Sequence, residues 1–194
     1  MSDLTPSMST MTNDTKTALQ EASESLSAAR AEADRQIEAC LAQIAEDLPA
    51  RAAEAAKRVA VEQPEVTKAL GKEGVAEMRS ALQTAAEEMG RQFVAAADEI
   101  DWPQGTSYSK VDNAKVHSAL FKRFYRRTDS LSQVLRTHGY ELGQSDPFIP
   151  QALYSEGKFT PLATALTALG KASANYQKAK KDYDNAAVDD LWGE

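Results

Sequence analysis

Apolar residues recur at helical spacing through most of the chain. Between residues 14 and 48 they follow one another at intervals of three, four or seven, which places them on one stripe of an α-helix. The stripe is narrow and rich in alanine, as is typical of a coiled coil or a helical bundle. The same pattern continues over residues 75–100. The first stripe consists of Leu19, Leu26, Ala29, Ala33, Ile37, Leu41, Ile44 and Leu48.

Proline and glycine divide this first half into shorter predicted helices. Pro49 fits the first turn of a new helix, and Pro64 fits the same position in the next one. Gly71 and Gly74 mark a further break. Residues 14–70 contain no glycine and no aromatic residue, and strong helix formers dominate them. The sequence therefore predicts helices joined by bends.

The second half combines one clear loop with helices that carry bulkier side chains. Residues 101–109, DWPQGTSYS, hold proline, glycine and hydroxyl residues between two periodic segments. A helix is predicted over residues 112–138, with Gly139 as the residue past its end. After an irregular segment, Thr160 and Pro161 form a helix start, a hydroxyl cap followed by proline. All aromatic residues lie from Phe93 onward, so this half is predicted to hold the larger core.

No segment longer than four residues alternates with a period of two, so the sequence predicts an all-α fold. We expect long Ala-rich, coiled-coil-like helices followed by an aromatic-containing helical bundle. Five consecutive regions are predicted: a disordered leader (1–13), an elongated helical region (14–100), a loop (101–109), a helical bundle region (110–181) and an acidic C-terminal tail (182–194).

Composition narrows the classes of function. The chain has 22 basic and 29 acidic residues, and this balance argues against non-specific coating of nucleic acid. Its one cysteine, Cys40, excludes an intramolecular disulfide and fits a reducing compartment. No apolar run approaches the roughly 20 residues of a membrane span. We predict a cytoplasmic protein without a transmembrane segment.

Positive charge gathers in one segment, around FKRFYRR at residues 121–127. A helical wheel turns Phe121 and Phe124 toward the core. It also places Arg127 along the apolar face, where a guanidinium is tolerated only if it snorkels to solvent or meets a carboxylate on a neighbouring helix. We expect the second, so Arg127 is predicted to form a structural ion pair. The exposed charges are interpreted as a solvated face, a docking site for an acidic protein, or a site for nucleic acid or anionic lipid. This candidate basic ridge comprises Lys115, Lys122, Arg123, Arg126 and Arg136.

The acidic tail has five acids and no base from Asp182 onward, and it carries Val188, Leu191 and Trp192 as apolar anchors. In one interpretation the helix continues to about Leu191 and Trp192 folds back to cap the bundle. In a second, the three anchors insert into a groove on another protein. A third is pairing of the tail with the basic ridge, within one chain or between two copies.

Residues for enzymatic chemistry are scarce. His117 and His138 are too far apart for a helical metal pair, and Cys40 has no histidine near it. No glycine-rich phosphate loop or nucleophile elbow occurs. We predict no catalytic residue, no metal, no cofactor and no small-molecule substrate.

The predicted role is a non-enzymatic adaptor or accessory subunit that binds a protein partner or itself through coiled-coil and tail contacts. The alternative is a helical protein that binds nucleic acid through the ridge at 115–136.

Overall fold

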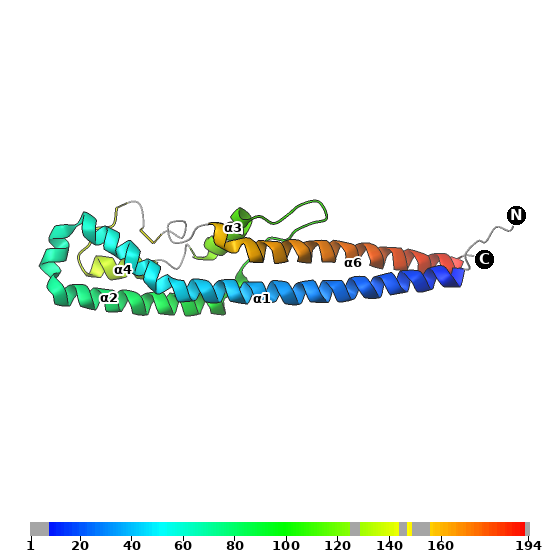
Figure 1. Ribbon diagram of the computed structural model, residues 1–194, viewed down its shortest axis with the longest axis horizontal. Coiled ribbons are helices and arrows are strands. Elements are labelled where there is room, and N and C mark those ends of the chain that lie inside the picture. The colour runs from blue at the N-terminus through cyan, green and yellow to red at the C-terminus, as the bar shows by residue number, and fades with distance from the viewer. Residues whose placement is uncertain (1–7, 125–128, 144–146, 149–155, 193–194) are drawn as a thin grey trace. The chain divides into compact units, whose positions relative to one another are not determined.

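The computed structural model describes residues 8–124, 129–143, 147–148 and 156–192. Within these ranges every regular element is a helix and no strand occurs, which confirms the all-α prediction. The elements are α1 (Met8–Glu62), α2 (Pro64–Ala95), η1 (Ala97–Glu99), α3 (Asn113–Phe124), α4 (Asp129–Thr137), η2 (Glu156–Phe159) and α6 (Thr160–Trp192), as Figure 1 shows.

Helix α1 runs through Pro49, so the break predicted there is wrong. Proline has no N–H and cannot donate the hydrogen bond that the carbonyl of Ala45 would accept in a regular helix. Apolar residues on both sides of Pro49 are buried, among them Leu48 and Ala52, and their packing holds the helix together across it. The helix also begins at Met8, inside the range predicted as a disordered leader.

We expect Pro49→Ala to raise the free energy of unfolding by about 1–3 kcal/mol, because alanine restores the missing donor in the helix interior. Urea unfolding followed by circular dichroism measures the change. Pro64→Ala is the matched control, because Pro64 occupies the first turn of α2, where the N–H that alanine would restore has no intrahelical acceptor. Equal effects of the two substitutions would contradict a continuous α1.

The other predicted helix signals are largely confirmed. Helix α2 starts at Pro64, and Gly71 interrupts it with a φ of 65°, in the left-handed region that favours glycine. Gly139 has a φ of 87° and follows α4 as predicted. Its N–H donates to the carbonyl of Arg136, and the N–H of Tyr140 donates to that of Leu135. This pair of bonds forms a Schellman motif, which satisfies the last carbonyls of α4.

The chain divides into two compact units, and α1 and α6 contribute residues to both. Unit 1 comprises residues 1–35, 104–111 and 163–194, and unit 2 comprises residues 36–103 and 112–162. This division differs from the consecutive regions predicted from the sequence. Helical periodicity identifies which side of a helix is buried, but not which distant segment covers it.

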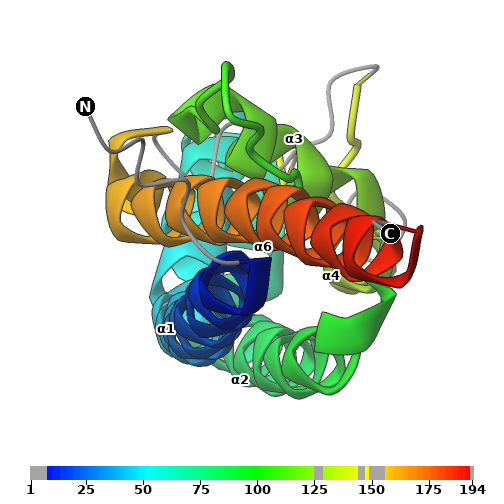
Figure 2. The same cartoon turned by 90° about the vertical axis from the view of Figure 1, so that its right-hand side faces the viewer.

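In unit 1, the N-terminal part of α1 and the C-terminal part of α6 run side by side in opposite directions (Figures 1 and 2). Small side chains are buried in this unit, including Ala33, Ala165 and Ala172. Alanine lets helix backbones approach closely, so the Ala-rich stripe of the sequence is used for helix pairing. Knobs-into-holes geometry over residues 14–100 stays a prediction.

In unit 2, the second part of α1 packs with α2 around an aromatic core. The rings of Phe93 and Phe124 meet edge to face with centroids 4.7 Å apart, and Phe121 lies 5.5 Å from Phe124. The helix predicted over 112–138 consists of two elements, α3 and α4, and residues 125–128 lie outside the described part. The predicted buried face is confirmed: Val116, Leu120, Phe124, Leu131 and Leu135 are all fully buried.

Polar contacts fasten the segment after α4 to the junction between α1 and α2. The side-chain amide of Gln63 donates to the Glu141 carbonyl (2.7 Å) and accepts from the Glu141 N–H (2.9 Å). The hydroxyls of Thr67 and Tyr140 lie 3.0 Å apart, and Tyr140 is buried. Within the same unit, Lys158 donates to Asp47 and thereby lowers the pKa of that carboxyl.

Candidate functional site

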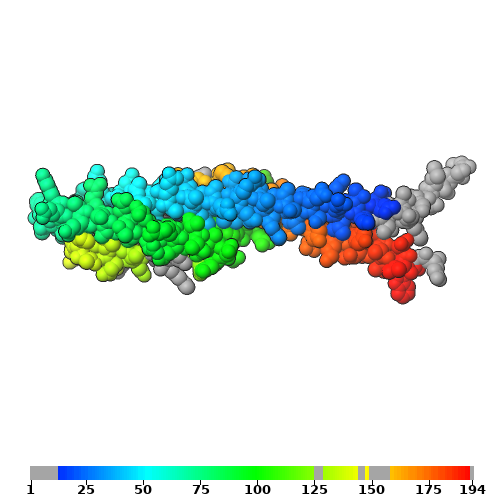
Figure 3. Space-filling model, turned by 90° about the horizontal axis from the view of Figure 1, so that it is seen from below, coloured from blue at the N-terminus to red at the C-terminus, as the bar shows by residue number. Residues whose placement is uncertain are grey.

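The last turns of α6 present an apolar stripe to solvent. Val188, Leu191 and Trp192 lie on one face, because positions i, i+3 and i+4 are neighbours on a helix surface. Their exposed fractions are 52%, 82% and 84%. Figure 3 shows this red end of α6 at the surface. We call these three residues the C-terminal stripe.

The exposure of Trp192 decides part of the prediction for the acidic tail. Helix α6 does continue through Leu191, as one interpretation predicts. The expectation that Trp192 folds back onto the bundle is wrong, because this side chain is exposed. Helix geometry gives the reason: Trp192 lies about 160° around α6 from the buried Ala172. Docking of the stripe into a groove on a partner stays a prediction.

Four exposed acids accompany the C-terminal stripe. Asp189 and Asp190 lie in the last described turn of α6, where the helix dipole disfavours negative charge. Exposed Leu191 and Trp192 also forgo the stabilisation that burial would give them. Neither feature stabilises unit 1, and such local conflicts are typical of functional surfaces. The acids are Asp182, Asp184, Asp189 and Asp190.

The segment 104–111 docks on α6 within unit 1, although the sequence predicts only a loop there. The N–H of Val111 donates to the Thr167 hydroxyl at 2.9 Å. Gly105 and Gly170 meet so closely that a Cβ on Gly170 would lie 2.0 Å from the Gly105 carbonyl oxygen. Sequence analysis missed this pair, because isolated glycines signal a close approach without naming the segment approached.

The candidate basic ridge is divided between two helices. Lys115 and Lys122 are exposed on α3, seven residues apart and thus on one face of it. Arg136 is exposed on α4. Figure 1 shows α3 and α4 apart, with α4 beside α2, while α3 contacts η2. The sequence pattern groups these residues on one face because it predicts a single straight helix for this part of the chain.

Arg123 differs from the rest of the ridge. It forms an ion pair with Glu99, so part of its charge is compensated inside unit 2. Its side chain is only half-buried, and the pair is therefore a modest contribution to stability. Arg126 and Arg127 lie outside the described residues, and the ion pair predicted for Arg127 stays a prediction.

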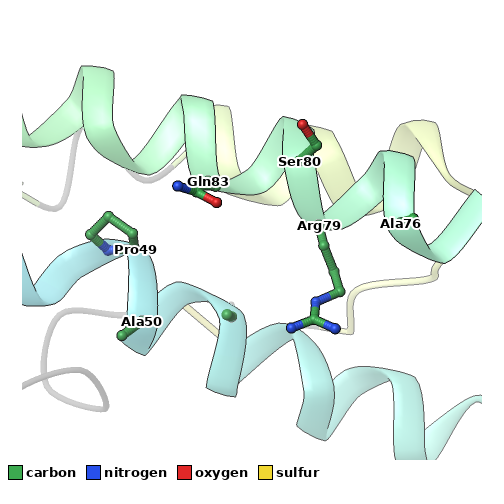
Figure 4. Close-up of a pocket in the computed structure, with 7 residues that line it drawn as sticks. Pro49, Ala50, Ala76, Arg79, Ser80 and Gln83 are labelled. Carbon is green, nitrogen blue, oxygen red and sulfur yellow. The ribbon is translucent and has the colours of Figure 1, made fainter.

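A shallow groove lies between α1 and α2 at Pro49. Its α1 side is formed by proline and alanine, and Figure 4 shows Arg79 and Gln83 reaching from α2 toward α1. Small side chains on both helices leave this groove open. In the sequence, the only sign of it is that few large residues occur in these parts of α1 and α2. The lining comprises Pro49, Ala50, Ala53, Ala76, Arg79, Ser80 and Gln83.

Cys40 is predicted to be unreactive in the folded protein. Burial raises the pKa of its thiol from 9.0 to about 11, because desolvation disfavours the thiolate. At pH 8 we expect negligible labelling by iodoacetamide in buffer and rapid labelling in urea, where the thiol returns to its ordinary pKa. Equal labelling rates in both conditions would contradict the buried environment.

Within the described ranges, no cluster of three or more His, Cys, Asp or Glu side chains is placed to hold a metal ion. None of the described helices is both long and apolar enough to cross a bilayer.

Comparisons with protein-family models, with curated proteins and with solved structures found no match.

Proposed function

We propose that this protein is a non-enzymatic helical adaptor or accessory subunit that works through protein–protein contacts, in the cytoplasm. The single observation that supports this best is the C-terminal stripe. Large apolar side chains grouped on an exposed helix face mark interaction sites, and tryptophan is enriched among residues that dominate binding energy. The paired helices of unit 1 supply a scaffold that holds the stripe in a fixed helical geometry.

The proposed contact follows the helix-in-groove mode. Anchors at i, i+3 and i+4 fill an apolar groove, which buries the exposed area of Leu191 and Trp192. The surrounding aspartates select a partner groove with a basic rim and exclude acidic ones. Electrostatic attraction of this kind speeds association and weakens as salt increases.

A photo-crosslinking amino acid at Asn185 tests the proposal in cells. Asn185 is exposed and lies about 60° from Val188 around α6, at the edge of the stripe. We expect crosslinked adducts whose yield falls about tenfold or more when Leu191→Asp is added, since a charged side chain cannot fill an apolar pocket.

The same crosslinker at Glu77 is the matched control, because Glu77 is an exposed position on α2, within unit 2. Adducts at 185 that do not exceed those at 77, or that persist in the Leu191→Asp variant, would refute the proposal. The mass of the adduct identifies whether the partner is another protein or a second copy.

Nucleic-acid binding by the ridge stays an alternative with less support. Arg123 is engaged by Glu99, and Arg136 lies on a different helix from Lys122. Phosphate binding predicts an affinity that falls steeply with salt and that weakens equally for all sequences in Lys122→Ala. Tail docking predicts no effect of Lys122→Ala.

A further inference from the structure

We propose that the surface bearing the C-terminal stripe binds a second copy of this chain, through an antiparallel contact between the C-terminal halves of two α6 helices. This inference rests on the proposed function, because it names the occupant of the same surface. Two independent features of α6 support it: the order of charges along the helix and the spacing of residues on its exposed face.

Charge is arranged in two consecutive blocks along α6. Residues 171–181 contain four lysines and no acid, and residues 182–192 contain four aspartates and no base. A segment with this order is complementary to itself when two copies run in opposite directions. The basic block of each copy then lies beside the acidic block of the other.

The exposed face of the same segment follows a heptad pattern. Six positions are separated alternately by three and four residues, the spacing of the a and d positions of a coiled coil. Five of the six are exposed and the first, an alanine, is half-buried, so unit 1 leaves this face open. The positions are Ala174, Gln177, Lys181, Asp184, Val188 and Leu191.

One register satisfies both features. With a two-fold axis between Asp182 and Tyr183, Lys181 of each copy faces Asp184 of the second copy. The large side chain of Leu191 then faces the small Ala174, and every a position faces a d position. A polar pair in the centre of such a seam fixes its register and direction.

A parallel pairing is disfavoured by the same residues. It would place Lys181 against Lys181 and Asp184 against Asp184 in the centre of the seam. The antiparallel contact also brings lysines to the C-terminal turns of α6, where they favourably meet both the aspartates and the helix dipole. The seam is short and partly polar, so dimerisation is expected to depend on concentration.

Charge-swap complementation with the full-length protein tests this register. Lys181→Asp alone creates Asp–Asp pairs across the axis, and Asp184→Lys alone creates Lys–Lys pairs. We expect each single variant to dimerise about tenfold or more weakly than the wild type in sedimentation equilibrium. An equimolar mixture of the two variants restores opposite charges at both contacts and is expected to form a heterodimer of near wild-type affinity.

Lys72→Asp, an exposed lysine on α2, is the matched control and should leave dimerisation unchanged. A wild-type protein with the mass of one chain at every concentration, or a mixture that stays as weakly associated as the single variants, would overturn the inference. If the purified protein is a monomer while the crosslinker at Asn185 captures a different protein, the proposed function stands and the second copy is excluded. If the mixture restores dimerisation but no adducts form at Asn185 in cells, the contact with a second copy is supported and the proposed function is refuted.

Discussion

Replacing Phe93 with alanine is expected to lower the free energy of unfolding by about 3–5 kcal/mol, the range for truncating a buried phenylalanine. Phe93 is fully buried, and its ring meets Phe124 edge to face at 4.7 Å. The substitution removes the apolar area of the ring and this aromatic contact, and it leaves a cavity among side chains that already fill the core of unit 2. Urea unfolding of the full chain, followed by far-ultraviolet circular dichroism, measures the loss.

Val94→Ala is the control for this prediction. Val94 is the next residue of α2, but 42% of it is exposed. We expect a change below about 1 kcal/mol, partly offset by the higher helix propensity of alanine. Similar losses for the two variants would show that the aromatic cluster is not the core of unit 2.

The second large effect is expected at Gly170. In Gly170→Ala the new Cβ would lie 2.0 Å from the carbonyl oxygen of Gly105, a distance that no folded backbone tolerates. The segment 104–111 must therefore move away from α6 and lose the bond from Val111 to Thr167. We expect a destabilisation of about 3 kcal/mol, at the upper end for overpacking, despite the better helix propensity of alanine.

A local readout separates displacement of this segment from general unfolding. Limited trypsin digestion at Lys110 should accelerate in Gly170→Ala, because an undocked segment is a better substrate for the protease. Gly74→Ala is the matched control, since the nearest atoms to its new Cβ belong to the side chain of Leu70. Unchanged cleavage at Lys110 in Gly170→Ala would contradict the docking of 104–111 on α6.

Much of the fold follows from local sequence signals. Spacing identifies the buried sides of α3 and α4, and it does so although the chain forms two helices where one is predicted. Gly71 and Gly139 interrupt or end helices because their φ values lie in the left-handed region. Thr160 begins α6 as its hydroxyl-then-proline pattern predicts. These signals succeed because each depends on residues within one or two turns.

The errors share a physical cause, which is that tertiary packing overrides local preference. Pro49 is a helix breaker in isolation, but buried neighbours carry α1 across it. The pairing of the two ends of the chain in unit 1 and the ion pair of Arg123 with Glu99 join residues that are distant in sequence. No periodicity within a single helix contains this information.

The candidate site was found only in part from sequence. Composition identifies Val188, Leu191 and Trp192 as apolar anchors among acids, but it leaves open whether they cover the bundle or face solvent. Their exposure on α6 resolves that choice. The basic ridge has the opposite outcome. Its residues are predicted to share one face of a single helix, but the structure divides the described ones between α3 and α4.

We propose that contacts with protein cover the C-terminal stripe when the protein functions. The chain has two tryptophans, and Trp102, in unit 2, is an internal reference for the exposed Trp192. Tryptophan-selective footprinting, read by mass spectrometry, compares dilute purified protein with protein in intact cells. We predict that Trp192 reacts strongly in the dilute sample and is protected in cells, while the reactivity of Trp102 relative to the dilute sample is unchanged. Equal reactivity of Trp192 in both samples would contradict this account.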